Sequence, residues 1–212
     1  MIDSSSLIFS TAYLPPIEYM VWLVGSKSIM IESHENYKKQ SYRNRCVIST
    51  ANGMLSLSIP VTKTFGNHTT VKDVKIDNSE KWQKRHWRAI ESAYNQSPFF
   101  LFYKDEFEFF FLQRYKYLFD FNTELLQTSL KLLKVNLKIA FSDLYINSYS
   151  GAFFDLRNKF SPKVKSDFVL PEYRQVFMDK LGFFPNLSII DLLFNVGNQS
   201  SQYLQSIKNL KV

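Results

Sequence analysis

Short runs with strand-like composition alternate with one helical run at the start of the chain. Residues 6–13 predict a strand that stops before Pro15-Pro16, and residues 28–32 predict a second strand. Between them, residues 17–24 predict a short helix. A strand, a helix and a strand in this order make a βαβ unit, so the two strands are expected to lie parallel in one sheet.

Two more strand-like runs, residues 45–50 and 54–61, flank an Asn-Gly pair at 52–53. Asn-Gly between such runs is the strongest short-range signal for a β-hairpin, because both residues tolerate the positive φ angles of the turn. Residues 71–76 predict a further strand after a polar loop. The first half of the chain therefore predicts a mixed sheet.

A helix is predicted directly after this strand. Asp77 and Glu80 have the spacing of a capping box, which places the start of the helix at Asp77. Trp82 and His86 recur on one face, while the Lys and Arg residues lie mostly around the other side. The helix is expected to end near Asn95, before a Ser-Pro pair.

Strand signals become rare beyond residue 98. Apolar composition with helical spacing predicts helices at residues 99–103, 107–119, 123–133, 173–181 and 188–194. Residues 141–170 are expected to be irregular. No linker or repeat divides the chain, so the sequence predicts one mixed α/β domain over residues 1–212, with a helical part at 95–212.

Positive charge is concentrated in one quarter of the sequence. Between residues 38 and 88, 11 Lys and Arg stand against 3 Asp and Glu, whereas the other 161 residues are close to neutral. The same quarter carries Tyr, Trp, Asn, Gln and His side chains. We therefore expect residues 34–94 to form a binding segment for an anionic small molecule.

The loop after residue 33 supplies most of the candidate ligand-binding side chains. Arginine pairs with phosphate or carboxylate through two parallel donors, and Arg43 and Arg45 would point to one side of an extended segment. A solvated basic loop is the alternative interpretation. The candidate substrate-binding residues are Tyr37, Gln40, Arg43, Asn44, Arg45, Lys63, Lys72, Asp77 and Trp82.

Three side chains are candidates for catalysis. His86 and His34 are candidate general bases, because imidazole titrates near neutral pH. Cys46 is a candidate acyl carrier, although it begins an apolar strand where a buried cysteine is common. His86 likewise lies on the apolar face of its helix, where a histidine is usually part of the core.

The sequence lacks the signature motifs of several classes of protein. The histidine and cysteine spacings of a metal site, a glycine-rich phosphate loop and a GxSxG nucleophile elbow are all missing, so neither a metal nor a cofactor is expected. A single cysteine, no secretion signal and no apolar run long enough to cross a bilayer predict a cytoplasmic protein. The sequence leaves the oligomeric state open.

The sequence resembles the WbqC-like protein family. The resemblance is carried by residues 12–19 (AYLPPIEY), 35–46 (ENYKKQSYRNRC), 57–61 (LSIPV), 93–100 (AYNQSPFF) and 184–195 (FPNLSIIDLLFN). It implies a bacterial enzyme associated with surface-polysaccharide (O-antigen) synthesis, which transfers an acyl or aminoacyl group to an amino sugar. A nucleotide sugar would then be the anionic ligand, and an acyl-CoA a donor. The resemblance brings no catalytic residues with it.

The alternative is a non-catalytic protein that binds single-stranded nucleic acid or another anionic partner. Aromatic rings beside Lys and Arg support such binding without any catalytic group. It ranks second because the basic excess is modest and no RNA-binding signature is present.

Overall fold

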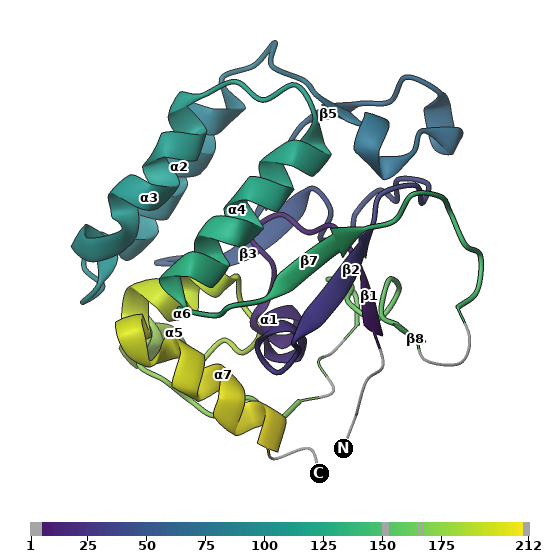
Figure 1. Ribbon diagram of the computed structural model, residues 1–212. Helices are drawn as coiled ribbons and strands as arrows, with labels where there is room; N and C mark the ends of the chain where they lie inside the picture. The colour runs from purple at the N-terminus through teal and green to yellow at the C-terminus, as the bar shows by residue number, and fades with distance from the viewer. Residues whose placement is uncertain (1–5, 150–152, 165, 167, 210–212) are drawn as a thin grey trace.

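A parallel sheet of four strands lies at the centre of the computed structural model, which describes residues 6–149, 153–164, 166 and 168–209 (Figure 1). The strands are β1 (Ser6–Ser10), β2 (Ser28–Glu32), β7 (Lys138–Phe141) and β8 (Phe153–Asp155). Their order is β7-β2-β1-β8, and every neighbouring pair is parallel. The middle of β1 is an apolar run, Leu7-Ile8-Phe9, and all three side chains are buried, as expected in a parallel sheet.

The predicted βαβ unit is confirmed. Helix α1 (Ile17–Val24) connects β1 to β2, and the two strands are paired in parallel from Leu7–Ile29 to Ser10–Glu32. The C-terminal helix α7 (Ser200–Asn209) packs against α1. The α/β fold class, with helices mainly in the second half, is thus as the sequence predicts.

The predicted hairpin is also confirmed. Strands β3 (Arg45–Thr50) and β4 (Gly53–Ser58) pair antiparallel, and Ala51-Asn52 form the turn. Gly53 has φ +105°, a conformation that favours glycine. The hairpin forms a sheet of its own and does not join the central one.

The predicted strand at residues 71–76 is wrong in its first half. A 3₁₀ turn, η2 (Val71–Asp73), comes first, and only the short strand β6 (Lys75–Ile76) follows, paired with β5 (Val61–Thr62). The N–H groups of Val71 and Lys72 bind the carbonyls of Glu35 and Ser33. Because these bonds hold residues 71–73 against the loop after β2, the segment cannot extend there.

Helices α2 (Trp82–Tyr94), α3 (Phe100–Leu112) and α4 (Leu118–Leu132) lie together on one side of the sheet in Figure 1. The predicted start of α2 at Asp77 is too early, because the Asp77 carboxylate accepts the N–H of Ser79 in a turn. The predicted helix at 107–119 is divided between α3 and α4. Residues 113–117 are not helical, and the N–H of Ile76 binds the carbonyl of Lys116 there.

Two predictions for the C-terminal half need correction. Strands β7 and β8 lie in the part of the chain that was expected to be helical or irregular. Within the predicted irregular segment at 141–170, residues 150–152, 165 and 167 lie outside the described residues. The predicted helix at 173–181 is reduced to α5 (Met178–Leu181), since Tyr173 and Gln175 bind the buried Asp191 instead. The predicted helix at 188–194 is present as α6 (Ile189–Val196).

Large aromatic rings fill the core around helices α2 and α4. Phe121 lies at the centre, and the rings of Tyr13, Trp82 and Tyr115 lie 5.0–5.9 Å from it. None of the described helices is both long and apolar enough to span a membrane. The expected cytoplasmic location stays a prediction.

Candidate functional site

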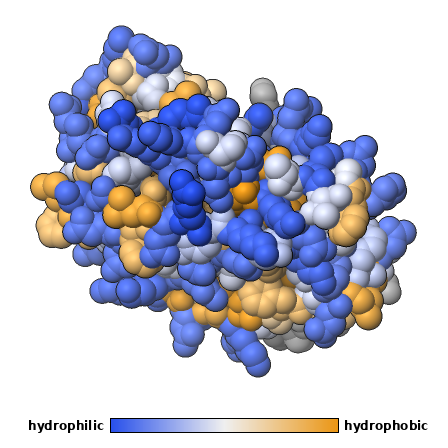
Figure 2. Space-filling model, turned by 90° about the horizontal axis from the view of Figure 1, so that it is seen from above, coloured by the Kyte–Doolittle hydropathy of each residue, from blue (hydrophilic) through white to orange (hydrophobic). Residues whose placement is uncertain are grey.

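The carboxyl ends of the four parallel strands meet at one edge of the central sheet. Open α/β sheets bind their ligands at this edge, because loops from neighbouring strands converge there. In Figure 1 the arrows of β2 and β7 point toward the top, so Figure 2 looks down on that face. Hydrophilic side chains cover most of the face, with apolar patches mainly near its margins.

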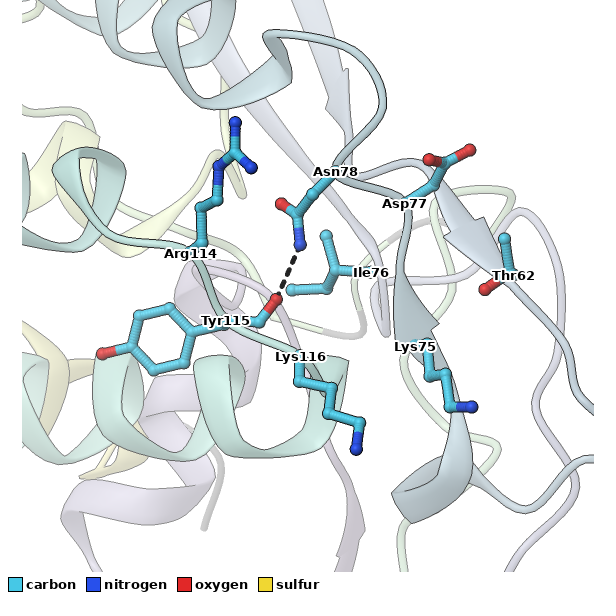
Figure 3. A pocket seen from close by; sticks show the side chains of 8 residues that line it. All are labelled: Thr62, Lys75, Ile76, Asp77, Asn78, Arg114, Tyr115 and Lys116. Atoms are coloured by element: carbon cyan, nitrogen blue, oxygen red, sulfur yellow. Dashed lines mark hydrogen bonds between the residues drawn. The ribbon is translucent and has the colours of Figure 1, made fainter.

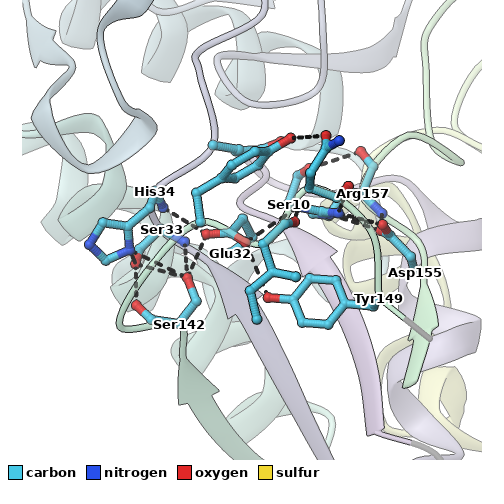
Figure 4. A network of polar contacts seen from close by, with 12 residues as sticks. Ser10, Glu32, Ser33, His34, Ser142, Tyr149, Asp155 and Arg157 are labelled. Atoms are coloured by element: carbon cyan, nitrogen blue, oxygen red, sulfur yellow. Dashed lines mark hydrogen bonds and ion pairs between the residues drawn. The ribbon is translucent and has the colours of Figure 1, made fainter. Parts of the chain in front are cut away.

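A buried carboxylate, Glu32, lies at the end of β2 and is fully shielded from solvent (Figure 4). It accepts hydrogen bonds from the His34 N–H at 2.9 Å, the Ser142 hydroxyl at 2.6 Å and the Tyr149 hydroxyl at 3.3 Å. Arg157 Nη1 is 3.4 Å away. Glu32 therefore joins the segments that follow β2, β7 and β8.

Arg157 is the cationic partner of this carboxylate and is itself buried. It forms a close ion pair with Asp155, at 2.6 Å, and donates to the carbonyl of Ile146 at 2.9 Å. The rings of Tyr145 and Tyr149 lie 5.4 and 4.9 Å from the guanidinium. Burial alone would raise the pKa of Asp155, but its hydrogen bonds to Arg157 hold that pKa below the ordinary value.

A second buried ion pair joins Arg43 to Glu35. Arg43 Nε and Nη2 bind the two carboxylate oxygens at 2.9 and 2.6 Å, and Nη2 also binds Ser10 Oγ at 2.6 Å. Ser10 in turn donates to the carbonyl of Arg157 at 2.8 Å. Arg43 therefore fixes the end of β1 to the loop after β2, and its charge is neutralised within the protein.

A pocket of about 420 Å³ opens beside these ion pairs. It is lined by His34, Glu35, Asn36, Lys38, Tyr145, Arg157 and Asn158. Lys38 binds the side chain of Asn158 across it, so the loops after β2 and β8 meet there. The one lining carboxylate, Glu35, is already paired with Arg43. Arg157 is likewise paired with Glu32 and Asp155, so Lys38 is the lining charge that remains for a ligand.

His34 is held in one orientation at this pocket. Its Nε2 lies 2.7 Å from Lys72 Nζ, and its Nδ1 lies 2.9 Å from Ser33 Oγ. An ammonium can only donate, so Nε2 accepts and the ring proton is on Nδ1. The Ser33 hydroxyl accepts the hydrogen bond from Nδ1–H and donates its own hydrogen bond to the carbonyl of Ser142 at 2.8 Å. The basic nitrogen of His34 is therefore the one at Nε2.

The other two catalytic candidates lie in the core. The Tyr13 hydroxyl is 3.0 Å from His86 Nδ1, and the ring of Trp82 packs edge-on against the imidazole at 5.1 Å. Burial lowers the pKa of His86 to about 4. Cys46 is buried beside Tyr13, and burial raises the pKa of its thiol. Both side chains are shielded from solvent, His86 is a weak base, and Cys46 is held as the thiol rather than the nucleophilic thiolate.

The remaining predicted ligand-binding residues are dispersed. Tyr37 and Trp82 are buried, Asn44 donates to the carbonyl of Ile59, and Arg45 donates to Ser58. Gln40 is exposed at a positive φ of 55°. Lys63 binds Asn67, and Asp77 lines a different pocket. Of the predicted residues, the structure places His34, Lys72 and Arg43 at the sheet edge, and Arg43 is held there in its internal ion pair with Glu35.

The sequence-based interpretation missed the residues that build the frame of this pocket. Glu32 is the last residue of a predicted strand, and its position at a carboxyl end was an available signal. Tyr145, Arg157 and Asn158 gave no such signal, because neither β7 nor β8 was predicted. Among the described residues, no group of three or more His, Cys, Asp or Glu side chains could hold a metal ion.

Comparison with known proteins gives the family. The model of the WbqC-like protein family matches residues 11–161, which include both buried ion pairs and the whole lining of the pocket. The chain belongs to the WbqC-like protein family. It is similar to the uncharacterized protein Rv1507c of Mycobacterium tuberculosis, with 25% identity over 93% of this chain and 96% of the relative. No solved structure matches it. This WbqC-like domain therefore has its pocket within the part that the family shares.

Replacing Arg157 tests the buried frame. Arg157→Met would leave the Glu32 carboxylate buried without its cation, so we expect it to lower the free energy of unfolding by about 3–5 kcal/mol. Adding Glu32→Gln to that variant should restore part of the loss, because it removes the unpaired charge. Urea unfolding measures both. Arg174→Met, which breaks the exposed pair with Asp179, is the control and should change little. Equal effects of the two arginine variants would contradict a structural role for the buried pair.

His86 predicts a specific pH dependence of stability. Its pKa of about 4 in the folded protein lies below the ordinary value of 6.5, so only the unfolded chain gains this proton between these pH values. The wild type should therefore lose stability relative to His86→Gln as the pH falls from 6.5 to 4. Urea unfolding of both proteins at several pH values gives the difference. A difference that is constant with pH would show that His86 is not held neutral in the core.

Proposed function

We propose that this protein transfers an acyl or aminoacyl group to the amine of a phosphate-bearing amino sugar, with His34 as general base. The observation that supports this most directly is the geometry of His34. Its Nε2 is basic and accepts a hydrogen bond from a primary ammonium, Lys72 Nζ, at 2.7 Å beside the pocket. A ligand amine can take that same position.

The charges of the pocket favour an anionic ligand. Lys38 lines it and Lys72 lies beside it, and each binds a neutral side chain. The charges of Glu35 and Arg157 are instead paired within the protein. The amides of Asn36 and Asn158 add donors and acceptors suited to sugar hydroxyls. In the proposed complex, Lys72 releases His34 and binds a phosphate oxygen, while the ligand amine occupies its place.

The reaction balances with a thioester donor and no further reagent. The neutral amine nitrogen attacks the carbonyl carbon of the thioester, and His34 Nε2 takes a proton from that nitrogen as the C–N bond forms. The C–S bond then breaks, and the imidazolium returns the proton to the departing sulfur. The products are an amide and a free thiol. Ser33 stabilises the imidazolium by keeping its Nδ1–H hydrogen-bonded throughout.

The transferase role that the resemblance to WbqC-like proteins implies is a further support for this proposal. The alternative, a surface that binds single-stranded nucleic acid, is less well supported by the structure than by the sequence. Trp82 and Trp87 are buried, so the basic side of α2 does not offer these rings for base stacking.

The test is release of free thiol from acyl-CoA thioesters in the presence of nucleotide-linked amino sugars. His34→Asn keeps a donor toward Ser33 but removes the base, so we expect kcat to fall by about 10²–10⁴-fold. His68→Asn, at an exposed histidine of the 3₁₀ turn η1 (Gly66–His68), should leave kcat unchanged. Circular dichroism confirms that both variants fold.

Two results would contradict the proposal. One is the absence of thiol release above the uncatalysed rate with every donor and acceptor pair. The other is activity of His34→Asn equal to that of His68→Asn. Tight binding of oligonucleotides in place of nucleotide sugars, abolished by added salt, would support the non-catalytic alternative.

A further inference from the structure

A second pocket, of about 380 Å³, lies where β5 and β6 meet the segment before α4 (Figure 3). It is lined by Thr62, Lys75, Ile76, Asp77, Asn78, Arg114, Tyr115 and Lys116. No residue is shared with the pocket beside His34. The proposed transferase mechanism uses none of these side chains.

Backbone pairing fixes the three segments that carry this pocket. Thr62 pairs with Lys75 in the β5–β6 ladder, and Lys75 forms a bridge with Tyr117 on its other side. The N–H of Ile76 binds the carbonyl of Lys116 at 2.9 Å, and the Asn78 amide binds the carbonyl of Tyr115 at 2.9 Å. Lys75 and Lys116 are therefore mounted on paired backbone, and Arg114 lies two residues before Lys116 on the same segment.

The charge of the pocket is strongly positive. Lys75, Arg114 and Lys116 line the pocket together with one carboxylate, Asp77. In Figure 3 the three cationic side chains extend in different directions, and the carboxylate points away from Arg114 and Lys116. Asp77 already accepts the N–H of Ser79 at 2.9 Å. Within the described ranges of the chain, none of the three cations forms an ion pair with a carboxylate.

We propose that this pocket binds the phosphate group of a small molecule. Three cations against one carboxylate leave an excess of two positive charges, which matches a phosphate dianion. Arg114 can bind two phosphate oxygens at once, and the lysines supply further charge-assisted donors. The Thr62 hydroxyl adds a neutral donor at the rim. The volume exceeds that of phosphate alone, so the ligand is a phosphorylated compound of the size of a sugar phosphate or nucleotide.

The same excess of charge could instead attract a polyanion such as RNA. The confinement of the three cations to one pocket favours the small molecule, because polyanions are bound along extended basic surfaces. The experiment separates the two sources of phosphate.

Isothermal titration calorimetry with inorganic phosphate, pyrophosphate and a short single-stranded oligonucleotide, at low ionic strength, tests the site. The wild type should bind pyrophosphate, with weaker binding of phosphate. The triple variant Lys75→Gln, Arg114→Gln, Lys116→Gln should bind pyrophosphate at least about tenfold more weakly. The matched control is Lys84→Gln, Arg88→Gln, Lys163→Gln, which removes the same charges at exposed positions elsewhere and should bind as the wild type does.

Each other outcome overturns the inference. No pyrophosphate binding by the wild type would do so, as would equal losses in both triple variants, which would indicate attraction to overall charge. Binding of the oligonucleotide alone would assign the surface to a polyanion. Arg114→Gln alters one exposed side chain, so its loss of binding stands even if the triple variant unfolds. His34→Asn should still bind pyrophosphate here, which keeps this result separate from the proposed transferase activity.

Discussion

Buried charge at the carboxyl edge of the central sheet is the constraint on which the site depends. Glu32 is fully buried, and Glu35, Arg43 and Arg157 are nearly so, and a buried charge without a partner is strongly destabilising. The Arg157–Glu32 pair satisfies that requirement only if the loop after β8 lies against the end of β2, whereas the Arg43–Glu35 pair forms within the loop after β2. Ser10 connects the two pairs through the end of β1. The pocket beside His34 has its shape because these pairs fix its walls.

The basic segment seen in the sequence has several structural roles. Arg43 belongs to the internal frame, Lys38 and Lys72 lie at the pocket beside His34, and Lys75 lies at the second pocket. On α2, Lys84 and Arg88 are exposed to solvent. A local excess of charge in a sequence can therefore combine structural, ligand-binding and solvated groups, and burial identifies the structural ones.

Local patterns predicted the elements whose formation depends on nearby residues. The Asn-Gly pair predicted the hairpin of β3 and β4, although the turn itself is Ala51-Asn52, and the apolar runs around the first helix predicted the βαβ unit. Strands β7 and β8 have four and three residues, and they exist because they pair with β2 and β1 more than one hundred residues earlier. No local pattern carries that information. Arg157 was missed with β8, whereas the core position of His86 was visible in the spacing of its helix.

The most direct test of the site is to map ligand binding by NMR, using backbone amide shifts and the His34 ring signals during titration with a nucleotide-linked amino sugar. We expect the largest shifts at His34, Asn36, Lys38 and Asn158, together with the His34 ring. Shifts at the second pocket are expected only from the phosphate groups of the ligand. Largest shifts around His86 and Cys46, with none at His34, would contradict it, because the ligand would then enter the core beneath the hairpin.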